Sequence, residues 1–158
     1  MVDPAIQAEA NWLNADTTVA NLLAPAGVLP YVRLNPPGDA RVCWLFRTRI
    51  DESREANQLK RLTHYFQLRI KWPLVAADAN VADLQAAADT LVAALLTRIR
   101  GTTLDKTHGY FFSVGESLTG TGNASVSVQY GDIEQAIRNA VPLQIDITYP
   151  AVQSSISG

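Results

Sequence analysis

The sequence is poor in the residues with which small proteins build covalent, metal or catalytic sites. It contains one cysteine, Cys43, and two histidines, His64 and His108. A single cysteine cannot form an intramolecular disulfide, and it excludes a cysteine-rich zinc framework. The two histidines lie far apart in the sequence, so no short-spaced pair of metal ligands is present. We therefore expect no metal site and no catalytic role for either histidine.

Motifs for covalent catalysis and nucleotide binding are incomplete. The stretch 115–119 begins like a nucleophile elbow, but Thr119 stands where the second glycine belongs. The stretch 120–122 lacks the third glycine of a dinucleotide-binding loop. The neighbouring acids Asp51 and Glu52 lie in a polar stretch, where carboxylates remain solvated. The sequence therefore predicts a protein that is not an enzyme and binds no cofactor.

Long apolar runs and a strong net charge are also missing. No stretch approaches the roughly 18 apolar residues of a membrane span, and the N-terminus lacks a basic region followed by an apolar one. The formal net charge of −2 argues against bulk nucleic-acid binding. Apolar residues make up 47% of the chain and charged residues 18%, which suits one folded domain. We expect a cytosolic domain that contacts no membrane.

Helix signals occur in three places. Asp3 and Pro4 are typical of the N-cap and first position of a helix, which we expect to continue to Leu13. Asp16 can cap a short second helix over 17–24. The strongest signal covers 81–100, with a stripe of apolar residues at three- and four-residue spacing that is wide enough to cover a sheet. The predicted stripe of this helix consists of Val81, Leu84, Ala88, Leu91, Leu95 and Ile99.

Strand signals lie on both sides of the long helix. Apolar and polar residues alternate over 42–50 and over 65–74, and the polar stretch 51–61 between them indicates a long hairpin arm. The alternation predicts that the core side of these two strands carries Trp44, Phe46, Phe66 and Trp72. Shorter alternating stretches predict further strands over 110–114, 125–130 and 141–149, and an edge strand is expected over 31–34.

This order of elements predicts a single α+β domain over residues 1–150. We expect a mostly antiparallel sheet with the long helix (about 80–100) and the N-terminal helix packed on one face. Residues 25–40 contain four of the eight prolines and are interpreted as a connector. Residues 151–158 are interpreted as a flexible C-terminal tail, and 115–123 as a mobile loop. The stretch 131–139 fits either a helical turn or an arm between strands.

Positive charge is concentrated in the middle of the chain. Residues 33–71 carry nine basic and four acidic side chains, whereas residues 101–158 carry two basic and five acidic ones. If the strands over 42–50 and 65–74 pair in register, Arg47, Arg49, Arg69 and Lys71 share one face with Tyr65. Such a face can bind nucleic acid, meet an acidic face of another copy, or simply be solvated. The expected position of the large aromatic side chains on the opposite face argues against direct nucleic-acid recognition.

The order of elements resembles that of the tail-terminator (tail-completion) proteins of tailed bacteriophages. The resemblance rests on the N-terminal helix, on the strand ending at Trp72-Pro73 that leads into the Ala/Leu-rich helix, and on the final alternating strand 142–149. It covers residues 1–24 and 41–150 as a pattern of elements and includes no diagnostic motif. It implies an α+β domain whose sheet carries helices on one side.

The resemblance also implies a structural virion protein, located in the neck or tail and in the host cytoplasm during assembly. Members of the family form a homohexameric ring that caps the tail tube and offers a docking surface to the head-side connector or stopper protein. On this interpretation Arg47, Arg49, Arg69 and Lys71 contribute to a subunit or partner interface, and no catalysis is needed. Two alternatives remain: another neck, head-completion or tube protein of the virion, or a small enzyme or ligand-binding domain whose site combines a histidine with a carboxylate.

Overall fold

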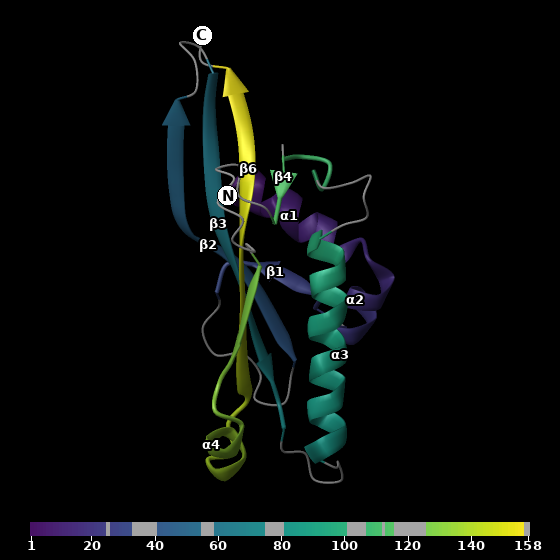
Figure 1. Cartoon of the computed structure of the whole chain (residues 1–158). Coiled ribbons are helices and arrows are strands. Elements are labelled where there is room, and N and C mark those ends of the chain that lie inside the picture. Colours follow the sequence, from purple (N-terminus) through teal and green to yellow (C-terminus); the bar gives the residue numbers. More distant parts are fainter. Residues whose placement is uncertain are drawn as a thin grey trace.

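The computed structural model describes residues 1–24, 26–32, 41–54, 59–74, 81–100, 107–111, 113–115 and 126–156. These residues form an α+β fold, as the sequence predicts (Figure 1). In chain order the elements are α1 (Pro4–Asn14), α2 (Thr17–Leu22), β1 (Val28–Pro30), β2 (Val42–Arg54), β3 (Leu59–Trp72), α3 (Val81–Arg100), β4 (Ser113–Val114), β5 (Ser127–Tyr130), α4 (Ile133–Arg138) and β6 (Leu143–Ile156).

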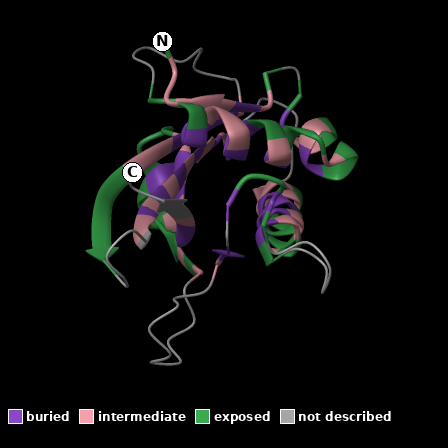
Figure 2. Ribbon diagram, turned by 90° about the horizontal axis from the view of Figure 1, so that it is seen from above, coloured by how far each residue is buried: buried purple, intermediate pink, exposed green. Residues whose placement is uncertain are grey.

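The sheet is built around the three long strands β2, β3 and β6. The strand order is β1-β2-β3-β6-β4, and β5 also pairs with β6. The β1–β2 pair is parallel, and the other pairs are antiparallel. Helices α1, α2 and α3 lie together beside one face of this sheet, as expected (Figure 1). In Figure 2 buried residues gather where these helices and the sheet meet.

Helix α1 begins and packs as its sequence predicts. The Asp3 carboxylate accepts a hydrogen bond from the Ala5 N–H at 2.9 Å, and Pro4 occupies the first turn. Ile6 and Leu13 are buried on one face of the helix. Capping therefore determines where the helix starts, and its apolar face attaches it to the rest of the domain.

Helix α3 also matches its predicted bounds. Leu91, Leu95 and Ile99 are fully buried, and Leu84 is partly buried. The Leu84 carbonyl accepts a hydrogen bond from the Trp72 indole N–H at 2.9 Å, which joins the helix to the end of β3. The proposed caps at Asn80 and Gly101 lie outside the described residues.

Two predicted boundaries are wrong. The described edge strand is Val28–Pro30, where the Asn14 side chain brackets Val28 with hydrogen bonds to its N–H and C=O at 2.8 and 2.9 Å; of the strand expected over 31–34, Tyr31 and Val32 are not strand, and 33–34 lie outside the described residues. The tail expected over 151–158 is strand β6 as far as Ile156, because the long strand β3 supplies ladder partners from Leu59 onward. The domain therefore continues past residue 150.

Other expectations are refined. Of the described residues in the strand predicted over 110–114, Ser113–Val114 is a strand and Tyr110 and Phe111 are not, since His108 and Gly109 form a turn just before them with φ of 50° and 73°. The ambiguous stretch 131–139 contains helix α4, capped by Asp132. Most of the expected connector 25–40 and most of the loop 115–123 lie outside the described residues.

The buried core covers only part of the long strands. The core cluster includes no residue of β2 beyond Leu45, of β3 before Phe66, or of β6 beyond Ala151. Beyond the core the three strands continue together as an extension, formed by 48–54, 59–63 and 153–156, which we call the β-arm. In Figure 1 the β-arm projects past the helices. The helix-covered remainder is called the body.

Candidate functional site

The four basic residues predicted to share one face do not all do so. The register pairs Arg69 with Trp44 and Arg49 with Tyr65, and directly paired residues point to the same side of a sheet. Arg49, Arg69 and Lys71 therefore lie on the sheet face opposite the helices, here called the outer face. Arg47 pairs with Phe66 and lies on the helix side. The physical reason is a β-bulge between Arg47 and Arg49, which shifts the alternation of β2.

The expected position of two aromatic residues is also wrong. Cys43 and Leu45 are the β2 residues that face the helices, and both are fully buried. Trp44 and Phe46 therefore lie on the outer face, beside the basic residues, although Trp44 is itself buried there. Both sides of this part of β2 are apolar, so period-two alternation alone could not orient it. Aromatic side chains therefore do not avoid the basic face.

Charges on the outer face are largely paired within the chain. Arg69 Nε lies 3.1 Å from Asp146 Oδ1, and Lys71 Nζ donates to Gln144 Oε1 at 2.6 Å. Partial burial raises the pKa of Asp146, but hydrogen bonds from Gln144, Gln67 and Arg69 and the charge of Arg69 outweigh it and leave that pKa below its usual range. The outer face is thus a ladder of matched polar groups and not an open basic patch.

Aromatic rings on the outer face are covered by guanidinium groups. The Arg49 guanidinium lies 4.2 Å from the Tyr65 ring centre, and that of Arg69 lies 5.3 Å from the Phe46 ring centre. A nucleic-acid base could stack on these rings only by displacing the arginines. This arrangement favours a protein surface over a base-stacking platform.

A second polar cluster lies where the β-arm leaves the body. His64 Nε2 lies 2.9 Å from Gln153 Oε1, and Arg47 Nη1 lies 3.3 Å from His64 Nδ1. Because Arg47 only donates and an amide oxygen only accepts, His64 is neutral with its hydrogen on Nε2. Burial lowers the pKa of His64, and the neighbouring Arg47 charge lowers it further, against the opposing effects of Gln153 and Asp3. Arg47 also pairs with Asp3 at 3.5 Å.

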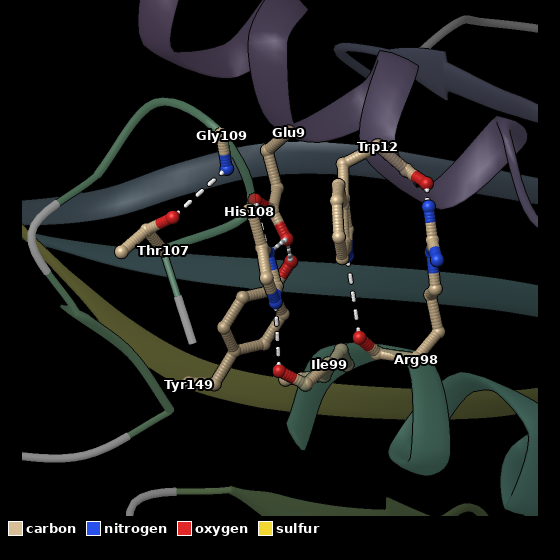
Figure 3. A network of polar contacts seen from close by, with 8 residues as sticks. All are labelled: Glu9, Trp12, Arg98, Ile99, Thr107, His108, Gly109 and Tyr149. Carbon is tan, nitrogen blue, oxygen red and sulfur yellow. Dashed lines mark hydrogen bonds and ion pairs between the residues drawn. The ribbon is translucent and has the colours of Figure 1, made fainter. Parts of the chain in front are cut away.

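The most deeply buried polar group is a cluster that the sequence did not reveal (Figure 3). The Glu9 carboxylate lies 2.9 Å from His108 Nδ1 and accepts a 2.8 Å hydrogen bond from the Tyr149 hydroxyl. His108 Nε2 donates to the Ile99 carbonyl at 2.8 Å. Burial and the nearby Glu9 raise the pKa of Tyr149, so its hydroxyl stays protonated and donates. The cluster joins α1, α3, β6 and the 107–110 turn.

Trp12 and Arg98 enclose the cluster on one side (Figure 3). The Trp12 ring stacks on His108 with centroids 4.7 Å apart, and the Arg98 guanidinium lies 3.7 Å from the Trp12 ring centre. The Trp12 indole donates to the Arg98 carbonyl, and Arg98 Nε donates to the Trp12 carbonyl. One sequence signal pointed here: Glu9 occupies the apolar stripe of α1, between Ile6 and Leu13.

This histidine–carboxylate pair is not arranged as an open active site. The side chains of Glu9 and His108 are both 0% exposed, and every polar atom of the pair has a protein partner. A described cleft of about 300 Å³ lies elsewhere, between α4 and the β3–β6 pair, and includes neither histidine. In the described ranges no three His, Cys, Asp or Glu side chains come together as metal ligands. The pair therefore acts as a structural tie.

No protein-family model matches the chain, and no curated protein is significantly similar to it in sequence. Among the described helices, none is both long and apolar enough to span a bilayer. Function must therefore be argued from the geometry of this chain.

Proposed function

We propose that the chain is a structural virion protein of a tailed bacteriophage, a tail terminator that forms a ring, caps the tail tube and joins it to the head-side connector. The candidate interface residues are Arg49, Arg69 and Lys71 on the outer face, whereas Arg47 lies on the helix side and pairs with Asp3. In this proposal the protein needs no catalytic residue, and the ring is a homohexamer.

The observation that carries the proposal is the β-arm. Three strands run out of the body together, although the core cluster ends at Leu45, Phe66 and Ala151. A small sheet without a packed face has little burial of its own. An extension of this kind reaches the neighbouring subunits of an assembly, where contacts with them supply the missing burial.

The outer face adds a second line of support. It remains free of α1, α2 and α3, and it carries a ladder of ion pairs and amides around Arg69, Asp146 and Gln144. Satisfied polar ladders of this type suit a protein partner, because they fix the register without leaving a charge buried alone. A two-sided domain can thus pack its helices inward and present its sheet to another protein.

The proposal is tested by mass and by tube length. The purified chain should form one ring that grows no further when its concentration is raised. Addition of the ring to polymerising tail-tube protein from the same virion should stop tube growth at a fixed length. Unlimited stacking of the chain by itself would instead identify a tube protein. A monomer that leaves tube growth unchanged would contradict the proposal.

The basic residues can be tested in the same assay. Reversal of Lys71 and Arg49 to glutamate should weaken ring assembly or tube capping, with the defect most visible at low salt. Reversal of Arg100 and Arg138, which are exposed on helices, makes a matched control with the same change in net charge. Equal defects in both variants would show that net charge matters and that the outer face does not.

A further inference from the structure

We propose that the free edge of β2 in the β-arm pairs, antiparallel and about a two-fold axis, with the same edge of a second copy of this chain. The proposal goes beyond the proposed function and does not rest on it. Among the described strands, only β1 pairs with this edge, at Cys43–Leu45, whereas β2 continues to Arg54. The backbone groups along the remainder are available for a further strand.

Strand geometry limits where the two-fold axis can lie. In a regular antiparallel pair, directly opposed residues both turn their N–H and C=O groups toward the partner or both turn them away. A two-fold axis between identical strands must therefore place one residue directly opposite its own copy. It cannot place a residue opposite the copy of its neighbour. The bulge between Arg47 and Arg49 ends the regular alternation, which leaves the stretch 49–54.

Charge selects one residue of that stretch. An axis at any of the charged residues Arg49, Asp51, Glu52 and Arg54 would oppose that side chain to its own copy, and like charges placed directly opposite are unfavourable. An axis at Ser53 would use only the end of the strand. An axis at Ile50 instead sets each Arg49 opposite Asp51 of the second copy.

The side chains around Ile50 fit this arrangement. Ile50 is 43% exposed, and at the axis it would pack on Ile50 of the second copy. Arg49 and Asp51 already form an ion pair at 3.0 Å with exposed side chains. Two copies would join these pairs into a ladder of four alternating charges.

The two-fold contact is separate from a ring contact. A two-fold interface joins copies in pairs and cannot by itself close a six-fold ring, which requires a heterologous interface. The edge can therefore link two free chains or two rings. Pairing at this edge can therefore be measured whether or not the chain forms rings.

Cysteine cross-linking tests the predicted register. Opposed residues in an antiparallel pair have Cα atoms about 4.5–5.5 Å apart, which a disulfide can span. Ile50→Cys should form a covalent dimer under mild oxidation. Ser53→Cys, on the same exposed strand, is the matched control, since its two copies would lie about 20 Å apart at about 3.3 Å per residue. Native Cys43 does not compete, because it is fully buried and burial raises its pKa to about 12.

The expected result is a cross-linking rate about ten-fold or more higher for Ile50→Cys, because pre-paired thiols meet at high effective concentration. Equal rates for the two variants, or no cross-link in either, would overturn the proposal and show that the charges keep this edge solvated. Rings without the Ile50→Cys cross-link would overturn the edge pairing alone. Cross-linked dimers without rings would support the edge pairing and count against the ring.

A charge exchange tests the chemistry of the contact. Arg49→Asp places carboxylates opposite each other and should weaken pairing about ten-fold, whereas Arg49→Asp combined with Asp51→Arg should restore it. Sedimentation of the otherwise native chains measures both. Failure of the double exchange to restore pairing, with the fold intact by circular dichroism, would contradict the proposed register.

Discussion

The body and the β-arm consist of the same three strands but differ in what stabilises them. In the body, Leu68 and Ile70 of β3 and Ile147 of β6 are fully buried beneath the helices. In the β-arm, the residues of β2 from Thr48 to Arg54 are all exposed. Backbone pairing of β3 with β6 continues without a break from one region into the other, and that of β2 with β3 resumes after the bulge between Arg47 and Arg49. Both regions therefore have backbone hydrogen bonds between strands, and the burial of apolar side chains distinguishes the body from the β-arm.

This difference separates two roles. The body contains enough apolar burial to fold as a unit. The β-arm has surface ion pairs, such as Lys60 with Glu52 at 3.4 Å, and pairs of this kind contribute little to the free energy of unfolding. We infer that the body is responsible for stability and the β-arm for contact between molecules. The predictions below test this division, beginning with the largest expected effect.

Removal of the buried Glu9 carboxylate should lower the free energy of unfolding more than any other change considered. Glu9→Ala leaves His108 Nδ1 and the Tyr149 hydroxyl buried without an acceptor, and breaking a buried pair in this way costs about 3–5 kcal/mol. Chemical denaturation measures the loss. Glu9→Gln is the control, because its amide oxygen can still accept from the Tyr149 hydroxyl and its N–H can donate to Nδ1 once His108 is neutral with its hydrogen on Nε2. Equal losses for both variants would contradict the hydrogen-bond assignment.

Truncation of a buried side chain in the apolar stripe of α3 should lower the free energy of unfolding by a similar or smaller amount than Glu9→Ala. Leu91→Ala removes a fully buried side chain, so the free energy of unfolding should fall by about 2–5 kcal/mol. Thr97→Ala, on the exposed side of the same helix, should change it little. A denaturation midpoint for Leu91→Ala that matches the parent would mean that this face is not buried in solution.

The junction between body and β-arm should be sensitive to acid. The pKa of His64 is lowered in the folded protein, so above its ordinary value of 6.5 the group is neutral in both states and has no effect. As the pH falls below about 6.5, the unfolded chain binds the proton first, and stability decreases until the pH passes the folded pKa. Thermal unfolding between pH 8 and 5 measures this slope.

His64→Gln should reduce the slope over that pH range. The variant removes the titrating ring beside Arg47 and Gln153, while Asp146 titrates at lower pH because its pKa is also lowered. An identical slope in the variant and the parent would assign the acid sensitivity to another group.

Removal of the ion pair between Arg69 and Asp146 on the outer face should lower the free energy of unfolding least. Asp146→Asn removes the charge opposite Arg69 but keeps a polar side chain, and partly exposed pairs contribute about 0–1 kcal/mol. The loss should be complete above the ordinary pKa of 3.8, should shrink as the pH falls below that value, and should vanish once the pH has fallen through the lowered pKa of folded Asp146. A loss as large as that of Glu9→Ala would show that the outer face belongs to the stabilising core.

Sequence reasoning succeeded where one strong signal determined the result. The apolar stripe from Val81 to Arg100 gave helix α3 with its bounds, and Asp3 with Pro4 gave the start of α1. It failed at β2, where both faces near Trp44 are apolar and a bulge shifts the later residues. It also failed after residue 150, because the polar composition there gave no sign that β3 would supply a pairing partner.

The candidate site was predicted less well than the fold. Arg49, Arg69 and Lys71 do share a face, but Arg47 does not, because the bulge lies between it and Arg49. The buried Glu9–His108 pair depends on a contact between α1 and the 107–110 turn, which are distant in sequence. No local pattern could predict that pairing, although an acidic residue within the apolar stripe of α1 marked a position that needed a partner.

Hydrogen exchange in the β-arm tests the central claim most directly. The amide protection of residues 49–54 should be compared with that of 66–70 in dilute and in concentrated protein. We expect the body to be protected at both concentrations, and the β-arm to become protected only when copies associate. Protection of the β-arm in dilute monomer as strong as that of the body would contradict the account, because it would show that the β-arm is stable without a partner.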